Sequence, residues 1–128
     1  MADSEARYSA LASSATIPIY IKDNDGRYLA ANAGLQNLLG LTEVEILGKS
    51  NAELLSDNNH EIYRENDVLV QEEKRTKSFE EKFLVDGHEM TFISVKAPLI
   101  GSDGEVYATS GISIDITEQI KYARQLEA

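Results

Sequence analysis

The segment Gly111-Ile-Ser-Ile-Asp-Ile-Thr-Glu118 contains the end of an apolar strand and the start of a charged helix, with no loop between them. Its isoleucines recur at every second position, which is the period of a β-strand. Asp115 and Glu118 have the spacing of a helix N-cap and its N3 partner, so we expect a capping box here. Because the strand runs directly into the helix, movement of a sheet can pass to the helix. This layout is typical of a sensor joined to an output, not of an enzyme with a self-contained site.

The remaining sequence predicts two strands, a helical block and then three strands. The strands are expected at 16–23, 27–31, 78–85, 90–99 and 106–116, because β-branched and aromatic residues are concentrated there. Helices are expected at 33–39, between the caps Asn32 and Gly40, and at 60–74, with a capped turn at 42–45 and a brief turn at 51–55 between them. Asp-Gly pairs at 25–26, 86–87 and 103–104 are strong hairpin signals. Five antiparallel strands with the helices on one face make an α+β fold.

The composition favours one small domain in a reducing compartment. The chain has 128 residues, of which 42% are hydrophobic, and it contains no Cys. It has no signal-peptide pattern and no apolar run long enough to span a membrane, so we expect a cytoplasmic domain, or the cytoplasmic part of a membrane-bound sensor. The formal net charge of −10 argues against nucleic acid as a partner and against direct membrane contact by this segment.

Several short segments, in this order and spacing, resemble a PAS domain of the type found in bacterial sensor histidine kinases and diguanylate cyclases. They are Ile17-Pro-Ile-Tyr-Ile-Lys-Asp-Asn-Asp-Gly, Ala31-Asn32, Leu38-Leu-Gly-Leu-Thr42, Ile46-Leu-Gly-Lys49, Arg64-Glu-Asn-Asp67, Phe79-Glu-Glu81, Phe92-Ile-Ser-Val-Lys-Ala-Pro-Leu99 and Gly111-Ile-Ser-Ile-Asp-Ile-Thr117. The resemblance implies the sheet order 2-1-5-4-3 and a possible ligand cavity between the sheet and the helices. It divides the chain into a flanking helix at 1–15, a PAS domain at 16–117 and the start of an output helix at 118–128.

The resemblance also assigns a role to the junction. Asp115, Thr117 and Glu118 match the family's junction motif and are predicted signal-relay residues; the alternative is an ordinary helix cap without signalling content. The apolar stripes of the two flanking helices predict a homodimer through those helices. The residues of these stripes are Tyr8, Leu11 and Ala15 in the first helix, and Ile116, Ile120 and Ala123 in the last.

For a ligand site, we expect the apolar strand positions to face the helices. Ile19, Ile21, Ile93, Val95, Ile112 and Ile114 are the candidates, with Leu38, Leu39 and Ile62 opposite them. Polar groups for a ligand could come from Tyr20, Tyr63, Thr91 and Ser110. The predicted ligand-binding set is Ile21, Leu39, Ile62, Tyr63, Ile93, Val95, Ser110 and Ile112. The sequence leaves open whether these residues bind a ligand or only pack together.

Cofactors and catalysis are not expected. His60 begins the long helix, where some PAS oxygen sensors ligate haem, but polar residues surround it in the sequence, and the absence of Cys excludes a flavin–cysteine adduct. We therefore predict no haem, no non-covalent flavin and no metal site. The acidic pairs Glu72-Glu73 and Glu80-Glu81 point in divergent directions and are predicted to be solvated.

The favoured function is a non-catalytic PAS sensory and dimerisation module. It would relay a change induced by a small molecule or a partner to an effector domain of the same chain, such as a histidine kinase of a two-component system or a diguanylate cyclase. One alternative is a constitutive protein–protein interaction domain without ligand sensing. Another is a small α+β isomerase-like enzyme, which would need a carboxylate facing the cavity.

Overall fold

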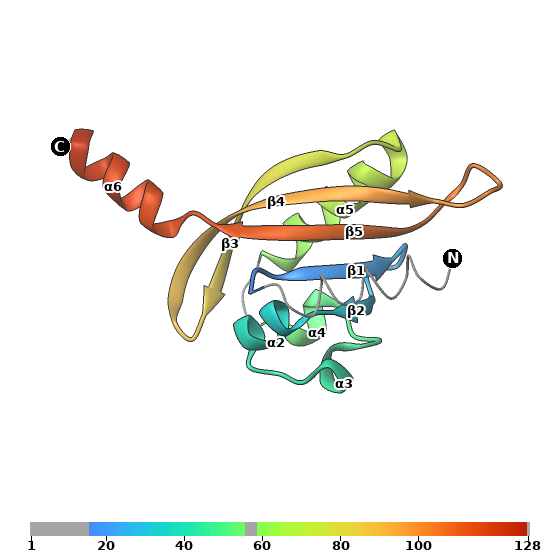
Figure 1. The fold of residues 1–128 in the computed structure, drawn as a ribbon, viewed down its shortest axis with the longest axis horizontal. Coiled ribbons are helices and arrows are strands. Elements are labelled where there is room, and N and C mark those ends of the chain that lie inside the picture. The colour runs from blue at the N-terminus through green and yellow to red at the C-terminus, as the bar shows by residue number, and fades with distance from the viewer. Residues whose placement is uncertain (1–15, 56–58, 128) are drawn as a thin grey trace.

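The computed structural model describes residues 16–55 and 59–127. Its strands form one antiparallel sheet in the order β2-β1-β5-β4-β3, with the last strand between the first and the fourth (Figure 1). The strands are β1 (Ile19–Asp23), β2 (Tyr28–Ala31), β3 (Lys77–Val85), β4 (His88–Ile100) and β5 (Val106–Asp115). The predicted α+β class and the predicted strand order are both confirmed.

The helices are α2 (Ala33–Leu39), α3 (Glu43–Ile46), α4 (Asn51–Leu54), α5 (His60–Glu73) and α6 (Thr117–Glu127). Two helices, α2 and α3, begin at the capping residues that the sequence indicated, whereas Asn59 makes no side-chain cap at α5. Asn32 caps α2 by accepting a hydrogen bond from the Leu35 amide, and α2 ends at Gly40 in the left-handed conformation. Thr42 and Glu45 form a capping box at α3. The predicted flanking helix at 1–15 lies outside the described residues.

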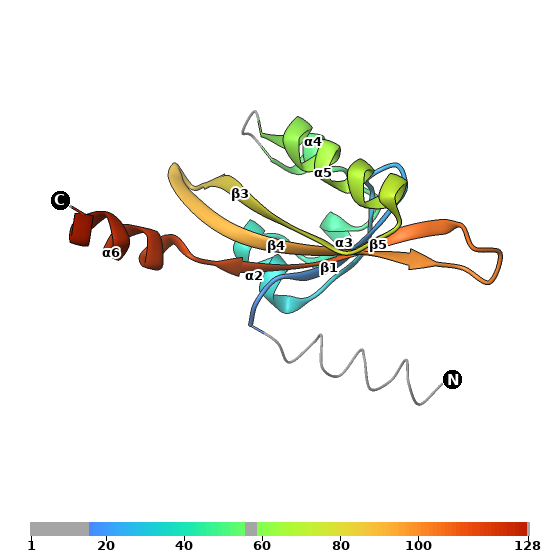
Figure 2. The same cartoon turned by 90° about the horizontal axis from the view of Figure 1, so that it is seen from above.

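The sheet, α4 and α5 form two layers. Figure 2 shows α4 and α5 on one side of the sheet, while α6 projects beyond the end of β5. We call the sheet face beneath α5 the inner face; it carries Tyr20, Lys22, Lys96 and Ser113. A cluster of buried residues fills the space between this face and α2 and α3 at the β1–β2 end. The interior space next to this cluster is bounded by α2, α4, α5 and the inner face.

The prediction of which sheet face points toward the helices is wrong. Ile19 pairs with Ile112, and Ile112 pairs with Val95, so these residues share one face. Tyr20, on the other face, belongs to the buried cluster. The isoleucine-rich face is therefore the outer one, and Ile112 and Ile114 remain 38% and 43% exposed. The alternation along the strands correctly predicted that these residues share one face. That face, however, points away from α5.

The buried side of α5 also differs from the prediction. The sequence predicts an inward face that includes Ile62, but Ile62 is 50% exposed. The buried residues of α5 are Tyr63, Asp67 and Val70, which have the spacing of one helix face. The observed stripe is displaced by one residue and contains a charge, so a search for apolar residues alone could not select it.

Gly111 makes a close approach between β5 and Tyr20 possible. A Cβ atom on Gly111 would lie 2.3 Å from the buried Tyr20 ring. We predict that Gly111→Ala lowers the free energy of unfolding by about 1–3 kcal/mol, because the ring would have to leave its packed position. Urea unfolding measures this change. Ile112→Val, on the adjacent exposed residue of β5, should cost no more than about 0.5 kcal/mol; equal losses in the two variants would contradict a close contact between Gly111 and Tyr20.

Candidate functional site

Four charged side chains from four different elements meet in the interior. Lys22 on β1, Asp67 on α5, Glu81 on β3 and Lys96 on β4 are each at most 2% exposed. Nζ of Lys22 lies 2.6 Å from Oδ2 of Asp67, and Nζ of Lys96 lies 2.9 Å from Oδ1 of Asp67 and 2.7 Å from Oε2 of Glu81. We call these four residues the buried ion cluster. Its charges balance, as buried ionic groups require.

Polar and aromatic groups complete the surroundings of the cluster. Nζ of Lys22 lies 5.3 Å from the ring centroid of Tyr20 and 5.5 Å from that of Tyr28, within the range of cation–π attraction. The side-chain Nδ2 of Asn66 donates a hydrogen bond of 3.0 Å to Oε2 of Glu81. The Tyr28 hydroxyl donates to Oδ1 of Asn51 at 2.6 Å, which joins β2 to α4. These contacts hold the cluster in place beside the aromatic rings of Tyr20 and Tyr28.

Burial and pairing act in opposite directions on the cluster's pKa values. Burial alone would raise the pKa of Asp67, but Lys22 and Lys96 together hold it below its usual value. Burial would lower the pKa of Lys96, but Tyr20, Asp67 and Glu81 raise it. For Lys22, burial is the larger effect and lowers its pKa, although Asp67 opposes the shift. The two lysines therefore favour the charged form of Asp67 in spite of its burial.

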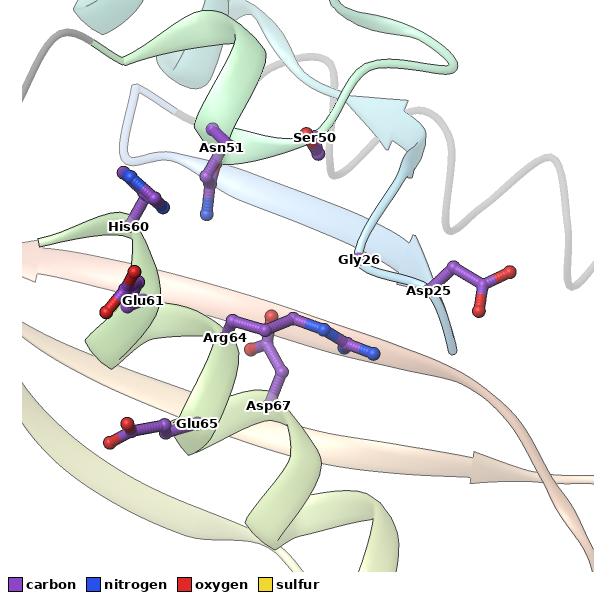
Figure 3. A pocket seen from close by; sticks show the side chains of 10 residues that line it. Asp25, Gly26, Ser50, Asn51, His60, Glu61, Arg64, Glu65 and Asp67 are labelled. Atoms are coloured by element: carbon purple, nitrogen blue, oxygen red, sulfur yellow. The ribbon is translucent and has the colours of Figure 1, made fainter.

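Two spaces adjoin the cluster. The interior cavity next to Lys22, Glu81 and Lys96 has a volume of about 20 Å³, which is room for about one water molecule. A cleft of about 450 Å³ opens between the β1–β2 turn, α4 and α5 (Figure 3), and this volume is in the range of small-molecule sites. Asn51 lines both spaces, and Asp67 lines the cleft while belonging to the ion cluster. The cleft thus reaches the polar centre of the domain.

The cleft has charged walls. Figure 3 shows Arg64 extending from α5 toward Gly26 in the β1–β2 turn, with Asp67 behind it. Nη2 of Arg64 donates a hydrogen bond of 2.6 Å to the Asn24 carbonyl, so Arg64 fastens α5 to the turn. His60 lies at the cleft beside α4, among polar residues as its sequence context indicated. Among residues 16–55 and 59–127, no group of three or more His, Cys, Asp or Glu side chains is arranged to hold a metal ion.

The structure separates the predicted ligand-binding residues into three groups. Leu39 and Tyr63 line the interior cavity. Ile62 is half exposed on α5. The others do not face the cavity, because their pairing places them on the outer face of the sheet; they are Ile21, Ile93, Val95, Ser110 and Ile112. Of the polar candidates, Tyr20 also lines the cavity, whereas Thr91 lies at the junction with α6.

The sequence pattern does not predict the ion cluster, because charged residues normally indicate solvated positions. Glu81 was predicted to be solvated, yet it is buried and paired with Lys96. Two sequence signals were available. Glu81 alternates with Phe79 and Phe83 on β3, and Asp67 has helical spacing to Tyr63 and Val70. A charge that repeats with the period of a buried face is a candidate for an internal ion pair.

At the junction, Asp115 and Thr117 tie β5 and α6 to β4. Oδ1 of Asp115 accepts hydrogen bonds from the Thr117 amide at 2.9 Å and from the Thr117 hydroxyl at 2.6 Å. Oγ1 of Thr117 accepts a bond of 3.0 Å from the Thr91 amide, and the Thr91 carbonyl accepts one of 2.9 Å from Ile116. We call this set the junction clamp. Asp115 does bind an amide of the first helical turn, but Glu118 forms no reciprocal capping bond within the described residues.

The depressed pKa of Asp67 predicts a pH-dependent loss of stability. Asp67→Asn keeps the shape but removes the charge, so we expect it to cost about 3–5 kcal/mol at pH 7, the range for breaking a buried ion pair. The folded pKa lies below the unfolded value of about 3.9. The wild type is therefore more stable than Asp67→Asn by the full amount above the pKa that Asp67 has in the unfolded state. This difference disappears as the pH falls through the pKa that Asp67 has in the folded state.

Urea unfolding of both proteins between pH 7 and pH 3 measures this difference. Glu80→Gln, on the exposed neighbour of Glu81, is the matched control and should change stability by no more than about 0.5 kcal/mol at any of these pH values. A difference between wild type and Asp67→Asn that stays constant down to pH 3 would contradict the assignment of charge to Asp67.

Solved structures of other proteins share this fold. The PAS domain of BvgS from Bordetella pertussis has 26% sequence identity and a TM-score of 0.76, with 98% of this chain and 95% of that chain covered. An RNA-binding Light-Oxygen-Voltage receptor (20% identity, TM-score 0.80) and the VqmA dimer of Vibrio cholerae (20%, 0.78) are similar over 96% and 89% of this chain. This chain spans only 36% and 52% of those two longer chains.

The family assignment rests on a match that covers most of the chain. A comparison with curated proteins gave no match. No helix in the described part of the chain is both long and apolar enough to cross a bilayer. Residues 12–121 match the family described as the PAS fold, and this chain therefore belongs to the PAS family of sensory and interaction modules.

Proposed function

We propose that this PAS domain senses a small molecule bound between α5 and the sheet and transmits its binding to α6. The observation that carries the proposal is the double position of Asp67, which lines the 450 Å³ cleft and also pairs with Lys96 of β4. Thr91, further along β4, holds Thr117 of α6. One strand therefore connects the ligand side of the domain to the output helix.

The mechanism requires two states with different contacts. In the state described, Asp67 is paired and the interior cavity is too small for a ligand. In the second state, α5 moves relative to the sheet, Lys96 changes partner, and β4 shifts against β5 at the junction clamp. The signal-relay residues are Asp115, Thr117 and Glu118, with Glu118 assigned only by its place in the motif. The effector of the same chain is a histidine kinase or a diguanylate cyclase.

Two other functions have less support. A constitutive interaction domain has no need for a ligand-sized cleft that reaches a buried ion cluster. An enzyme needs a free carboxylate in the cavity. Asp67 and Glu81 do face inward, but both are engaged by lysines. We also propose that the domain holds no haem or flavin and acts in the cytoplasm. The net charge of −10 argues against direct contact with nucleic acid.

The junction clamp can be tested with an isosteric pair of variants. Thr117→Val removes the hydroxyl and keeps the shape, whereas Thr117→Ser keeps the hydroxyl. We expect Thr117→Val to speed hydrogen exchange of the Ile116 and Ile120 amides about tenfold, since a lost hydrogen bond of roughly 1–1.5 kcal/mol corresponds to that factor. Thr117→Ser should exchange like the wild type.

The same two variants test signalling in the full-length protein. Thr117→Val should alter effector output, as should Asp115→Ala, while Thr117→Ser should leave it unchanged. Normal output from both Thr117→Val and Asp115→Ala, together with faster exchange in α6, would show that the motif is only a helix cap.

The flanking helices are the proposed dimer contact. In α6, Tyr122 and Leu126 are 66% and 88% exposed, and no residue of this helix is buried. A short helix with an uncovered apolar side gains stability from a partner. We predict that sedimentation equilibrium of the 128-residue chain shows a monomer–dimer equilibrium. Ile120→Lys and Leu126→Lys should each weaken it at least tenfold, and Gln125→Lys should not; a monomeric wild type at high concentration would contradict this.

A further inference from the structure

We infer that the ligand of this domain carries a carboxylate, which replaces Asp67 on Lys22 and Lys96. The inference rests on the proposed function and names the chemistry of its ligand. Its basis is the way in which the ion cluster is divided between the sheet and α5.

The sheet alone supplies an unbalanced charge. Lys22, Glu81 and Lys96 stand on β1, β3 and β4, and together they carry one net positive charge. Asp67, the only member from a helix, supplies the matching negative charge. If α5 withdraws, the sheet keeps two ammonium groups and one carboxylate, and an anion that binds in place of Asp67 restores the balance.

The contacts of Asp67 define the shape of that anion. Its two oxygens bridge two lysines, with Oδ2 at 2.6 Å from Lys22 and Oδ1 at 2.9 Å from Lys96. A planar group with two oxygens, of the size of a carboxylate, reproduces both contacts. A neutral amide offers only one acceptor oxygen and no charge, and a cation would add to the excess positive charge.

The route and the volume agree with this exchange. Asp67 lines the cleft, so an external carboxylate approaches from the side on which Asp67 stands (Figure 3). The cavity of about 20 Å³ cannot hold the ligand while Asp67 is in place. Binding therefore displaces Asp67. Movement of α5 also breaks the hydrogen bonds from Arg64 to the Asn24 carbonyl and from Asn66 to Glu81. The cleft accommodates the remainder of the ligand.

The first test replaces the bridging carboxylate by a free one. Asp67→Ala removes a group equivalent to formate, so formate should bind this variant and stabilise it. At ten times its dissociation constant, formate should raise the ratio of folded to unfolded protein about 11-fold, which is roughly 5 °C in Tm. Formamide at the same concentration, and sodium chloride at the same ionic strength, should give no shift. Asp67→Ala combined with Lys22→Met should lose the response to formate.

The second test uses the wild type and holds even if Asp67→Ala does not fold. In ¹H–¹⁵N spectra, acetate should shift the amides of Lys22, Asp67 and Lys96 in a saturable way, and acetamide should not. Equal shifts from acetate and acetamide would overturn the carboxylate assignment while supporting a ligand site between α5 and the sheet. No response to acetate in the wild type, or to formate in a folded Asp67→Ala, would also overturn it. The Thr117 variants test the relay separately.

Discussion

The carboxylate of Asp67 is the contact on which the arrangement of this domain depends. It is the only charged group of α5 that enters the interior ion cluster, and it bridges lysines from β1 and β4, which lie on either side of the central strand. Without it, two buried ammonium groups would face one carboxylate, a state that costs several kcal/mol. The position of α5 over the sheet is thus set by charge balance as well as by the packing of Tyr63 and Val70.

This constraint also explains the composition of the two sheet faces. The inner face carries Tyr20, Lys22 and Lys96, whose polar ends are satisfied by Ser113, Asp67 and Glu81. The outer face carries the isoleucines, which are partly exposed. A buried ionic group fixes a defined geometry because its partners must lie within hydrogen-bond distance, whereas apolar contacts tolerate small shifts. The inner face is therefore suited to a small number of discrete arrangements.

The sequence was sufficient to predict the fold but not the site. Strand periodicity, the Asp-Gly turns and the caps at Asn32 and Thr42 are local signals, and each was confirmed where the structure describes it. The choice of inner face is not local: alternation groups Ile19 with Ile112 but does not say which face α5 covers. The assumption that apolar residues point inward failed because the interior pairs charges from four separate segments, whose match appears only after folding.

The same pairing gives α6 a mechanical connection to the interior. Lys96 and Thr91 lie on one continuous strand, one within the ion cluster and the other within the junction clamp. A change of partner at Lys96 can shift β4 relative to β5, and Thr117 bonds to the backbone of β4 while its own chain continues from β5. The clamp therefore responds to relative movement of these two strands, and a uniform movement of the whole sheet would leave it unchanged. The proposed sensing should accordingly depend on α5 releasing one strand, not on displacement of the sheet as a body.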